Sequence, residues 1–273
     1  MPSRNTGELP SALGEFERVV QEFAGRKPVL FLDYDGTLTP IVERPEDALL
    51  SNDMRSVLSR LTDTLPVAVV SGRDVSFVRT QVALDGIVYA GSHGFDIVGP
   101  VSLSPEAVRR FDSFVSAIDS AESQLRNRLA EIPGARVERK KYSVAAHYRQ
   151  VDESRAPEVA SIVDDVVSAH PGLKKGLGKK VFEVRPDIDW DKGRAVLWLF
   201  EAMGYDIQSH VPLYIGDDVT DEDAFRALAD CGVGIVVAAS ERPTEARYRL
   251  KDTDEVREFL HRLARSAAGE EQA

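Results

Sequence analysis

The segment Phe31-Leu32-Asp33-Tyr34-Asp35-Gly36-Thr37-Leu38-Thr39 carries the clearest structural signal in this sequence. Apolar residues lead directly into two carboxylates and a Gly-Thr turn, which predicts a buried strand ending in a polar loop. Alternate residues of a strand project to the same side, so Asp33 and Asp35 can converge beyond the strand end. A hard cation such as Mg²⁺ takes oxygen ligands and would compensate these charges. An Asx turn would explain a bare Asp-x-Asp, but the buried strand and the Gly-Thr favour a metal site.

Four other short apolar runs have the same Val-, Ile- and Leu-rich character. They are Leu65–Ser71, Ile87–Gly91, Leu213–Ile215 and Val233–Val237. Such runs are typical of strands buried on both faces of a parallel sheet. Helical patterns lie between several of them, at Met54–Leu61, Ala195–Met203 and Asp223–Ala229, and another precedes the first strand at Leu13–Phe23. This alternation predicts a doubly wound α/β core.

The stretch from about Pro100 to Arg185 interrupts the alternation. Helical patterns occur at Pro105–Ile132 and Ala156–Ala169, and alternating runs at Arg136–Lys141, Ser143–Arg149 and, after a Gly/Lys-rich turn, Val181–Arg185. The mixture predicts an inserted α+β cap over the carboxyl ends of the core strands, where open α/β sheets bind ligands. We expect a flexible tail at 1–12, the core at 13–99 and 187–265, the cap at 100–186 and a flexible tail at 266–273.

The overall composition excludes several classes of protein. A net charge of -11 over 273 residues argues against nucleic-acid binding and requires local positive charge to attract an anionic substrate. A single cysteine, Cys231, excludes an internal disulfide and a cysteine-based zinc cluster. The start of the chain lacks the apolar segment of a signal peptide, and no apolar run is long enough to cross a bilayer. The expected location is therefore the cytoplasm.

A second acidic cluster, Gly216–Asp223, follows the short strand Leu213–Ile215. A capped helix start accounts for Thr220 and Asp223, because acids favour the first turn of a helix. It does not account for Asp217 and Asp218, which sit at the strand end. Two acidic strand ends in one sheet make a shared metal site the better explanation.

Two further segments could hold a phosphate. Ser71-Gly72-Arg73 joins an apolar strand to a helical pattern, and a hydroxyl beside helix N-terminal amides makes an anion site. Lys192 begins another apolar helix after Asp191. Taken singly, the first segment is an ordinary strand-to-helix turn, Asp191 is a helix cap and Lys192 is a surface lysine.

The order of these four elements resembles the haloacid dehalogenase (HAD) superfamily, whose motifs are Asp-x-Asp-x-Thr, Ser/Thr, Lys and Gly-Asp-x-x-x-Asp. The resemblance implies that Asp33 attacks phosphorus and that Asp35 serves as acid and base. It also implies that Ser71 and Lys192 hold the phosphoryl oxygens. Mg²⁺ would be bound by Asp33, by the backbone carbonyl of Asp35 and by Asp217. Asp221 would support these ligands without touching the ion, or would contact it through water.

Longer stretches are similar to the trehalose-6-phosphate phosphatase family in particular. They are Leu32–Ile41, Ala90–Gly94, His147–Arg149, Gly178–Pro186, Trp190–Gly193 and Gly216–Phe225. The resemblance implies a sugar-phosphate substrate, no nucleic-acid or membrane partner, and possible pairing with a trehalose-6-phosphate synthase. Ser71, Gly72 and Arg73 would bind the phosphate, and Lys179 and Glu183 are the first choices as sugar ligands.

Strand alternation supports a sugar site in the cap. It places Lys179, Glu183 and Arg185 on one side of their strand, and His147 and Arg149 on one side of theirs. His147 and Arg149 are therefore further candidates, although a solvated strand face explains the same pattern. His93 is read as a turn histidine more readily than as a ligand.

Three alternatives stay open at this point. The first is a phosphatase of sucrose phosphate or a glycosyl-phosphoglycerate, which would use the same core with other cap contacts. The second is a non-catalytic sugar-phosphate sensor, against which the intact Asp33, Asp35, Lys192 and Asp217 argue. The third is a phosphomutase, which would return the phosphoryl group to a sugar.

Overall fold

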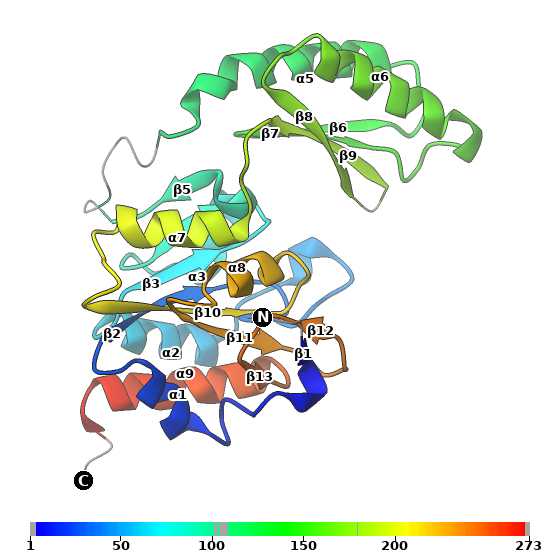
Figure 1. Cartoon of the computed structure of the whole chain (residues 1–273). Helices are drawn as coiled ribbons and strands as arrows, with labels where there is room; N and C mark the ends of the chain where they lie inside the picture. The colour runs from blue at the N-terminus through cyan, green and yellow to red at the C-terminus, as the bar shows by residue number, and fades with distance from the viewer. Residues whose placement is uncertain (1–3, 101–102, 104–108, 179, 271–273) are drawn as a thin grey trace. The chain divides into compact units, whose positions relative to one another are not determined.

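The computed structural model describes residues 4–100, 103, 109–178 and 180–270. The chain forms two compact units, one made of residues 1–108 and 190–273 and the other of residues 109–189 (Figure 1). The limits predicted for the inserted segment, 100 and 186, precede those of the second unit, 109 and 189, by nine and three residues. Within the described parts of the chain, no helix has the length and apolar character needed to span a bilayer.

A seven-stranded sheet with the order β13-β11-β10-β2-β3-β4-β5 organises the first unit (Figure 1). The strands are β2 (Lys27–Leu32), β3 (Val67–Val70), β4 (Val88–Gly91), β5 (Asp96–Val98), β10 (His210–Gly216), β11 (Val233–Val237) and β13 (Tyr248–Leu250). All neighbours run parallel except β5, which pairs antiparallel with β4. The predicted doubly wound α/β core is confirmed, and β5 and β13 are edge strands that the sequence did not reveal.

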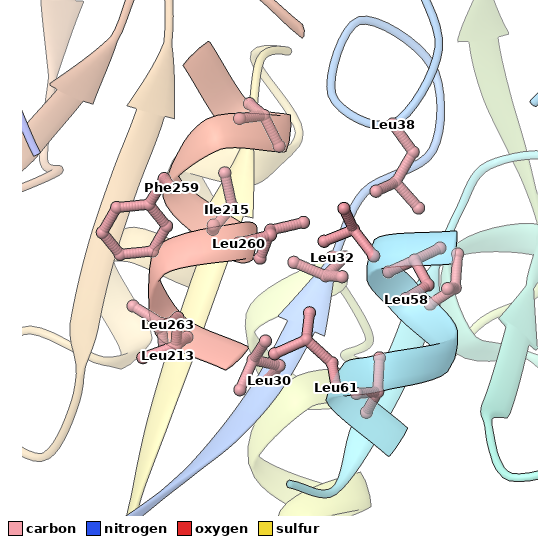
Figure 2. Packing of buried hydrophobic residues seen from close by; sticks show 14 of the residues in the cluster. Leu30, Leu32, Leu38, Leu58, Leu61, Leu213, Ile215, Phe259, Leu260 and Leu263 are labelled. Atoms are coloured by element: carbon pink, nitrogen blue, oxygen red, sulfur yellow. The ribbon is translucent and has the colours of Figure 1, made fainter. Parts of the chain in front are cut away.

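Helices cover both faces of this sheet because its strands are apolar on both sides. One face packs against α1 (Phe16–Glu22), α2 (Asn52–Thr62), α3 (Val75–Val82) and α9 (Thr253–Ala267). There, Leu30 and Leu32 of β2 lie among Leu58, Leu61 and Leu260 (Figure 2). Val29 and Phe31 belong to the opposite face, which packs against α7 (Lys192–Ala202) and α8 (Asp221–Ala227).

The strand register brings three chain segments to one edge of the sheet. Leu32 at the end of β2 pairs with Ile215 of β10 on one side and with Val69 of β3 on the other. The carboxyl ends of parallel strands lie at the same edge. The loops that follow β2, β10 and β3 therefore start beside one another.

The second unit has a four-stranded antiparallel sheet with the order β6-β7-β9-β8, and two helices pack on it (Figure 1). Its elements are α5 (Val115–Leu129), β6 (Arg136–Lys140), β7 (Ser143–His147), α6 (Ala156–Ser168), β8 (Leu173–Gly178) and β9 (Val181–Pro186). Val144, Ala146 and Val184 are buried, whereas the alternate positions Glu138, His147 and Glu183 carry polar groups. The sheet therefore has one apolar and one polar face, as the alternation predicts.

Several predictions about local structure need correction. The tail expected at 1–12 is packed from residue 4 onward, because β1 (Arg4–Asn5) pairs with β12 (Pro243–Thr244) and Thr6, Leu9 and Ala12 are buried. The helix predicted from 105 begins at Val115 after a short 3-10 turn, and residues 105–108 lie outside the described part.

Two further corrections concern the ends of elements. The Gly/Lys-rich segment expected to be a turn forms strand β8, because its backbone pairs along the whole of β9. Helix α9 continues to Ala267, past the start of the tail predicted at 266.

Candidate active site

Three acidic side chains meet where β2 and β10 end. Asp33 follows β2, and its amide donates a hydrogen bond of 2.9 Å to the carbonyl of Ile215. Asp217 follows β10, and Asp221 opens α8. One carboxylate oxygen of each lies within 4.8 Å of those of the other two. This is the shared acidic site that the two strand-end motifs predict.

Lys192 is inserted between two of these carboxylates. Its Nζ donates to Asp33 Oδ1 at 2.7 Å and to Asp221 Oδ1 at 2.6 Å, and the residue is 3% exposed. Lys192 is the first residue of α7, and the side chain of Asp191 caps this helix by accepting from the amide of Arg194 at 2.8 Å. Lys192 is therefore a buried site residue, and Asp191 has the capping role expected of it.

The carboxylates of this cluster outnumber its ammonium group. When all three are ionised they exceed the charge of Lys192 by two, with Asp33 and Asp221 buried and Asp217 half-buried. Burial raises the pKa of Asp33, the attraction of Lys192 opposes this rise, and Asp221 adds to it. Burial and the neighbouring Asp221 and Asp218 raise the pKa of Asp217 to about 7. A divalent cation with oxygen preference matches both the excess charge and the donor atoms.

The surrounding carboxylates keep Lys192 charged. Burial by itself lowers the pKa of Lys192, but Asp33 and Asp221 outweigh burial and the net pKa is raised. A permanently charged ammonium can stabilise an incoming phosphate and also the carboxylate form of Asp33.

Asp221 is held in place by protein donors. Its Oδ1 accepts from the Tyr214 hydroxyl at 2.6 Å as well as from Lys192, and its Oδ2 accepts from the amide of Asp218 at 2.8 Å. Both oxygens are thus engaged. This arrangement suits a residue that orients Lys192 and the loop carrying Asp217 better than a residue that binds a metal directly.

Gly36 lets the two acidic loops come together. Its φ is +74°, in the left-handed region that glycine adopts without strain, and a side chain there would overlap the carboxylate of Asp217. The Gly-Thr turn after Asp35 therefore does more than end the strand, because it makes room for Asp217 beside the backbone of the first motif.

Asp35 has a partner that the sequence did not reveal. Arg73 Nε donates to Asp35 Oδ2 at 2.6 Å, and Nη2 donates to Oδ1 at 2.5 Å. The guanidinium also lies over the ring of Phe77, 4.6 Å from its centroid. Arg73 was expected to bind phosphate, and in this structure it binds the carboxylate expected to act as acid and base.

Ser71 lies at the end of β3, adjacent to β2. It is 1% exposed, its amide donates to the carbonyl of Ala90 at 2.9 Å, and its hydroxyl accepts from the amide of Arg73 at 3.1 Å. The Ser71-Gly72-Arg73 loop thus belongs to the same edge of the sheet as the acidic cluster, and Arg73 connects it to Asp35.

Two of the residues predicted to bind sugar lie on strands of the second unit. Glu183 accepts from Ser143 Oγ at 2.8 Å, and His147 Nε2 lies 2.8 Å from Glu138 Oε2, all on the polar face of the second unit's sheet. Strand β7 ends at His147, so Arg149 lies in the following turn and does not continue the strand alternation. Lys179 lies outside the described residues.

Tyr214 and Glu138 contact predicted site residues, although neither was predicted as a site residue from the sequence. Tyr214 is a phenol within the otherwise aliphatic run that precedes Gly216, which is the signal that could have identified it. Glu138 is one of several charged residues in β6, and the strand pattern alone does not distinguish it from a solvated acid.

A sequence model of trehalose-phosphatases matches residues 31–254, which contain the whole acidic cluster, Ser71, Lys192 and the second unit. The chain belongs to the trehalose-phosphatase family.

Named relatives agree with this membership of the trehalose-phosphatase family. Trehalose-phosphate phosphatase B of Arabidopsis thaliana is 42% identical, over 96% of this chain and 74% of the relative. Trehalose 6-phosphate phosphatase RA3 of Zea mays is 42% identical, over 93% of this chain and 74% of the relative.

Solved structures of the family share the fold. A trehalose-6-phosphate phosphatase of Aspergillus fumigatus superposes with a TM-score of 0.70 at 27% identity, covering 94% of this chain and 99% of that one. The C-terminal domain of the Candida albicans trehalose-6-phosphate phosphatase gives a TM-score of 0.66 at 25% identity, covering 94% and 98%. The HAD-type fold with an inserted α+β unit is thereby confirmed.

Proposed function

We propose that this chain hydrolyses trehalose 6-phosphate to trehalose and inorganic phosphate. The observation that carries the proposal is the contact of buried Asp33 with Lys192 inside a cluster of three carboxylates. A carboxylate at a strand end can attack phosphorus, and the ammonium group beside it can bind the phosphate that is attacked. Family membership supplies the substrate, since the relatives are named for this reaction.

The reaction has two displacement steps. In the first, an Asp33 oxygen forms a bond to phosphorus, the bond from phosphorus to the sugar oxygen breaks, and Asp35 gives that oxygen a proton. In the second, Asp35 takes a proton from water as the water oxygen attacks phosphorus, which frees Asp33 and releases phosphate. Lys192 and Ser71 hold phosphoryl oxygens through both steps.

The acidic cluster fits Mg²⁺. The side chains of Asp33 and Asp217 and the backbone carbonyl of Asp35 would hold the ion, and Asp221 would support them or contact the ion through water. When bound, Mg²⁺ supplies charge neutralisation between the anionic nucleophile and the anionic phosphate. The donor set contains only oxygen atoms, which favours Mg²⁺ over softer metals.

Selection of the sugar is assigned to the polar sheet face of the second unit. Glu183, His147, Lys179 and Arg149 are the proposed sugar ligands, and Gly72 and Arg73 complete the phosphate site with Ser71. Hydrogen-bonding groups discriminate strongly among sugars, because a missing hydroxyl leaves a protein group without its partner. Pairing with a trehalose-6-phosphate synthase and a cytoplasmic location stay predictions.

A panel of substrates tests the function. Phosphate release is measured with Mg²⁺ on trehalose 6-phosphate, sucrose 6-phosphate, glucosyl-3-phosphoglycerate and glucose 6-phosphate, and the sugar products are separated to detect isomerised phosphates. We expect trehalose 6-phosphate to have the highest kcat/KM and free phosphate to account for all turnover. A preference for another disaccharide phosphate would overturn the substrate, and isomerised product would indicate a mutase.

A further inference from the structure

The turn that follows β4 has an unusual backbone. Ser92 and His93 have φ values of 50° and 58°, so two consecutive residues with side chains occupy the left-handed region. Each such residue is strained relative to a regular conformation, because its Cβ comes close to a backbone carbonyl oxygen. The next residue, Gly94, has a φ of 89°. Contacts with the rest of the protein must therefore impose this turn.

The contacts of the turn are with the proposed phosphate-binding loop. The amide of Ser92 donates to the carbonyl of Arg73 at 2.8 Å, and the amide of His93 donates to the carbonyl of Ser71 at 2.8 Å. These two carbonyls flank Gly72. The left-handed backbone of the turn thus directs two successive amides at the loop from which Ser71 and Arg73 project.

The ring of His93 covers Gly72. A Cβ at Gly72 would lie 2.7 Å from His93 Cε1 and 2.9 Å from Nε2, closer than carbon and nitrogen atoms pack. Gly72 does not lie in the left-handed region, so its backbone would accept alanine. The ring of His93, and not the φ of Gly72, is what requires glycine there.

The other side of the turn contacts the helix that carries Lys192. A side chain at Gly94 would overlap the Cβ of Ala195, in the first turn of α7. The next residue, Phe95, packs its ring 6.2 Å from that of Trp190, just before the helix begins. The turn therefore lies between the Ser71 loop and the Lys192 helix and contacts both.

We infer that the turn Ser92–Gly94 sets the placement of the phosphate-binding loop relative to Lys192, with His93 as the positioning residue. The inference rests on the proposed function, because it assigns His93 to the phosphate site of that reaction. His93 does not take part in the chemistry. Its ring and its amide keep the Ser71-Gly72-Arg73 loop in the one conformation that presents the Ser71 hydroxyl and the loop amides to phosphate.

A double-mutant cycle between Gly72 and His93 tests the inference. The variants are Gly72→Ala, His93→Gly and the double variant, and the control is Ala83→Gly, a left-handed residue at the end of α3. Three quantities are measured: Kd for inorganic phosphate by calorimetry with Mg²⁺, KM and kcat on trehalose 6-phosphate, and Tm. Glycine adopts the left-handed region freely, so His93→Gly is expected to stay folded.

We expect His93→Gly to raise the Kd for phosphate and the KM about 10-fold, with Tm within a few degrees of wild type. Gly72→Ala should have a similar or larger effect in the wild type, because its new Cβ meets the ring. In the His93→Gly background, Gly72→Ala should have little further effect, because the ring that its Cβ would meet is absent. Ala83→Gly should change neither phosphate binding nor KM.

Two results would overturn the inference: unchanged phosphate binding in His93→Gly, or an equal cost of Gly72→Ala in both backgrounds. If His93→Gly does not fold, His93→Asn takes its place, since asparagine tolerates the left-handed region. A wild-type protein that neither binds phosphate nor hydrolyses trehalose 6-phosphate would instead overturn the proposed function. If the wild type is active but the effects of Gly72→Ala and His93→Gly on phosphate binding are additive, only the inference about His93 would be overturned.

Discussion

The guanidinium group of Arg73 holds both carboxylate oxygens of Asp35, with Nε 2.6 Å from Oδ2 and Nη2 2.5 Å from Oδ1. A bidentate pair of this kind fixes the direction of the carboxylate. The proposed acid and base is thus oriented by a residue 38 positions later in the chain, in the loop that is proposed to bind phosphate.

This contact predicts a dependence on the leaving group. Asp35→Asn should lower kcat on trehalose 6-phosphate by about 10²–10⁴-fold, because both steps use Asp35. The first step alone, measured as the initial burst of released alcohol or phenol, should be slowed much less with p-nitrophenyl phosphate, whose leaving group needs no proton. Arg73→Lys loses the forked geometry, so we expect it to show the same pattern with a smaller loss, about 10-fold. Equal losses in the first step on both substrates would show that Arg73 acts on the phosphate alone and not through Asp35.

Replacement of the proposed nucleophile, Asp33, should abolish turnover without loss of structure. Asp33→Asn keeps the shape of the side chain but removes the attacking anion, and we expect kcat to fall by at least about 10⁴-fold. Circular dichroism and Tm report the fold, and Asp230→Asn on an exposed loop is the matched control. A variant at position 33 that retains a tenth of the activity would contradict the assignment.

The pKa of Asp217 predicts how stability depends on pH in the absence of metal. Because this pKa is raised from 3.8 to about 7, the folded protein binds a proton more tightly than the unfolded chain does. The contribution of Asp217 to stability is therefore full below about pH 4 and is lost as the pH rises through 7. In chelator at pH 8, Asp217→Asn should be more stable than wild type, on the order of 1 kcal/mol after allowance for solvent screening.

Added Mg²⁺ should reverse this order. The ion compensates the excess negative charge of the wild type, so its Tm should rise with Mg²⁺ concentration, whereas Asp217→Asn should respond weakly. Tm is measured for each protein in four conditions, with chelator and with Mg²⁺, each at pH 5 and at pH 8. Equal Mg²⁺ stabilisation of both proteins would remove Asp217 from the metal site.

Tyr214→Phe should lower activity through Asp221. The hydroxyl that donates to Asp221 Oδ1 at 2.6 Å is buried, and its loss should cost about 1.5–3 kcal/mol of stability and reduce kcat roughly 10-fold. The control is Tyr89→Phe. Tyr89 lies on β4 of the same sheet, and its hydroxyl donates to the carbonyl of Leu84 at 2.7 Å. That variant should lose stability and keep its kcat. Similar kcat losses in both would mean that Tyr214 has no specific role.

Glu183→Ala should impair sugar recognition selectively. We expect KM for trehalose 6-phosphate to rise about 10-fold or more, with little change on p-nitrophenyl phosphate, because the small ester offers no hydroxyls to this residue. Glu158→Ala, on the exposed side of α6, is the control. Parallel changes on both substrates would remove Glu183 from the sugar site.

Local sequence patterns predicted most of the core. The apolar run that ends at Asp33 and its parallel neighbours are recognisable because each strand buries both faces and carries its signal in consecutive residues. Edge strands β5 and β13 and the Gly/Lys-rich strand β8 escaped prediction. They are short or polar, and their stability comes from pairing with β4, β11 and β9 and not from their own composition.

The local motifs were enough to identify the candidate site and the family: two acidic strand ends, a serine turn and a lysine at a helix start, in an order that matches the trehalose-phosphatase model. The partners of those groups become known from the folded chain alone. It assigned Arg73 to Asp35, Tyr214 to Asp221 and the ring of His93 to Gly72. The physical reason is that a motif is local along the chain. Contacts between side chains of different strands and loops depend on sheet register and loop conformation, which no single segment encodes.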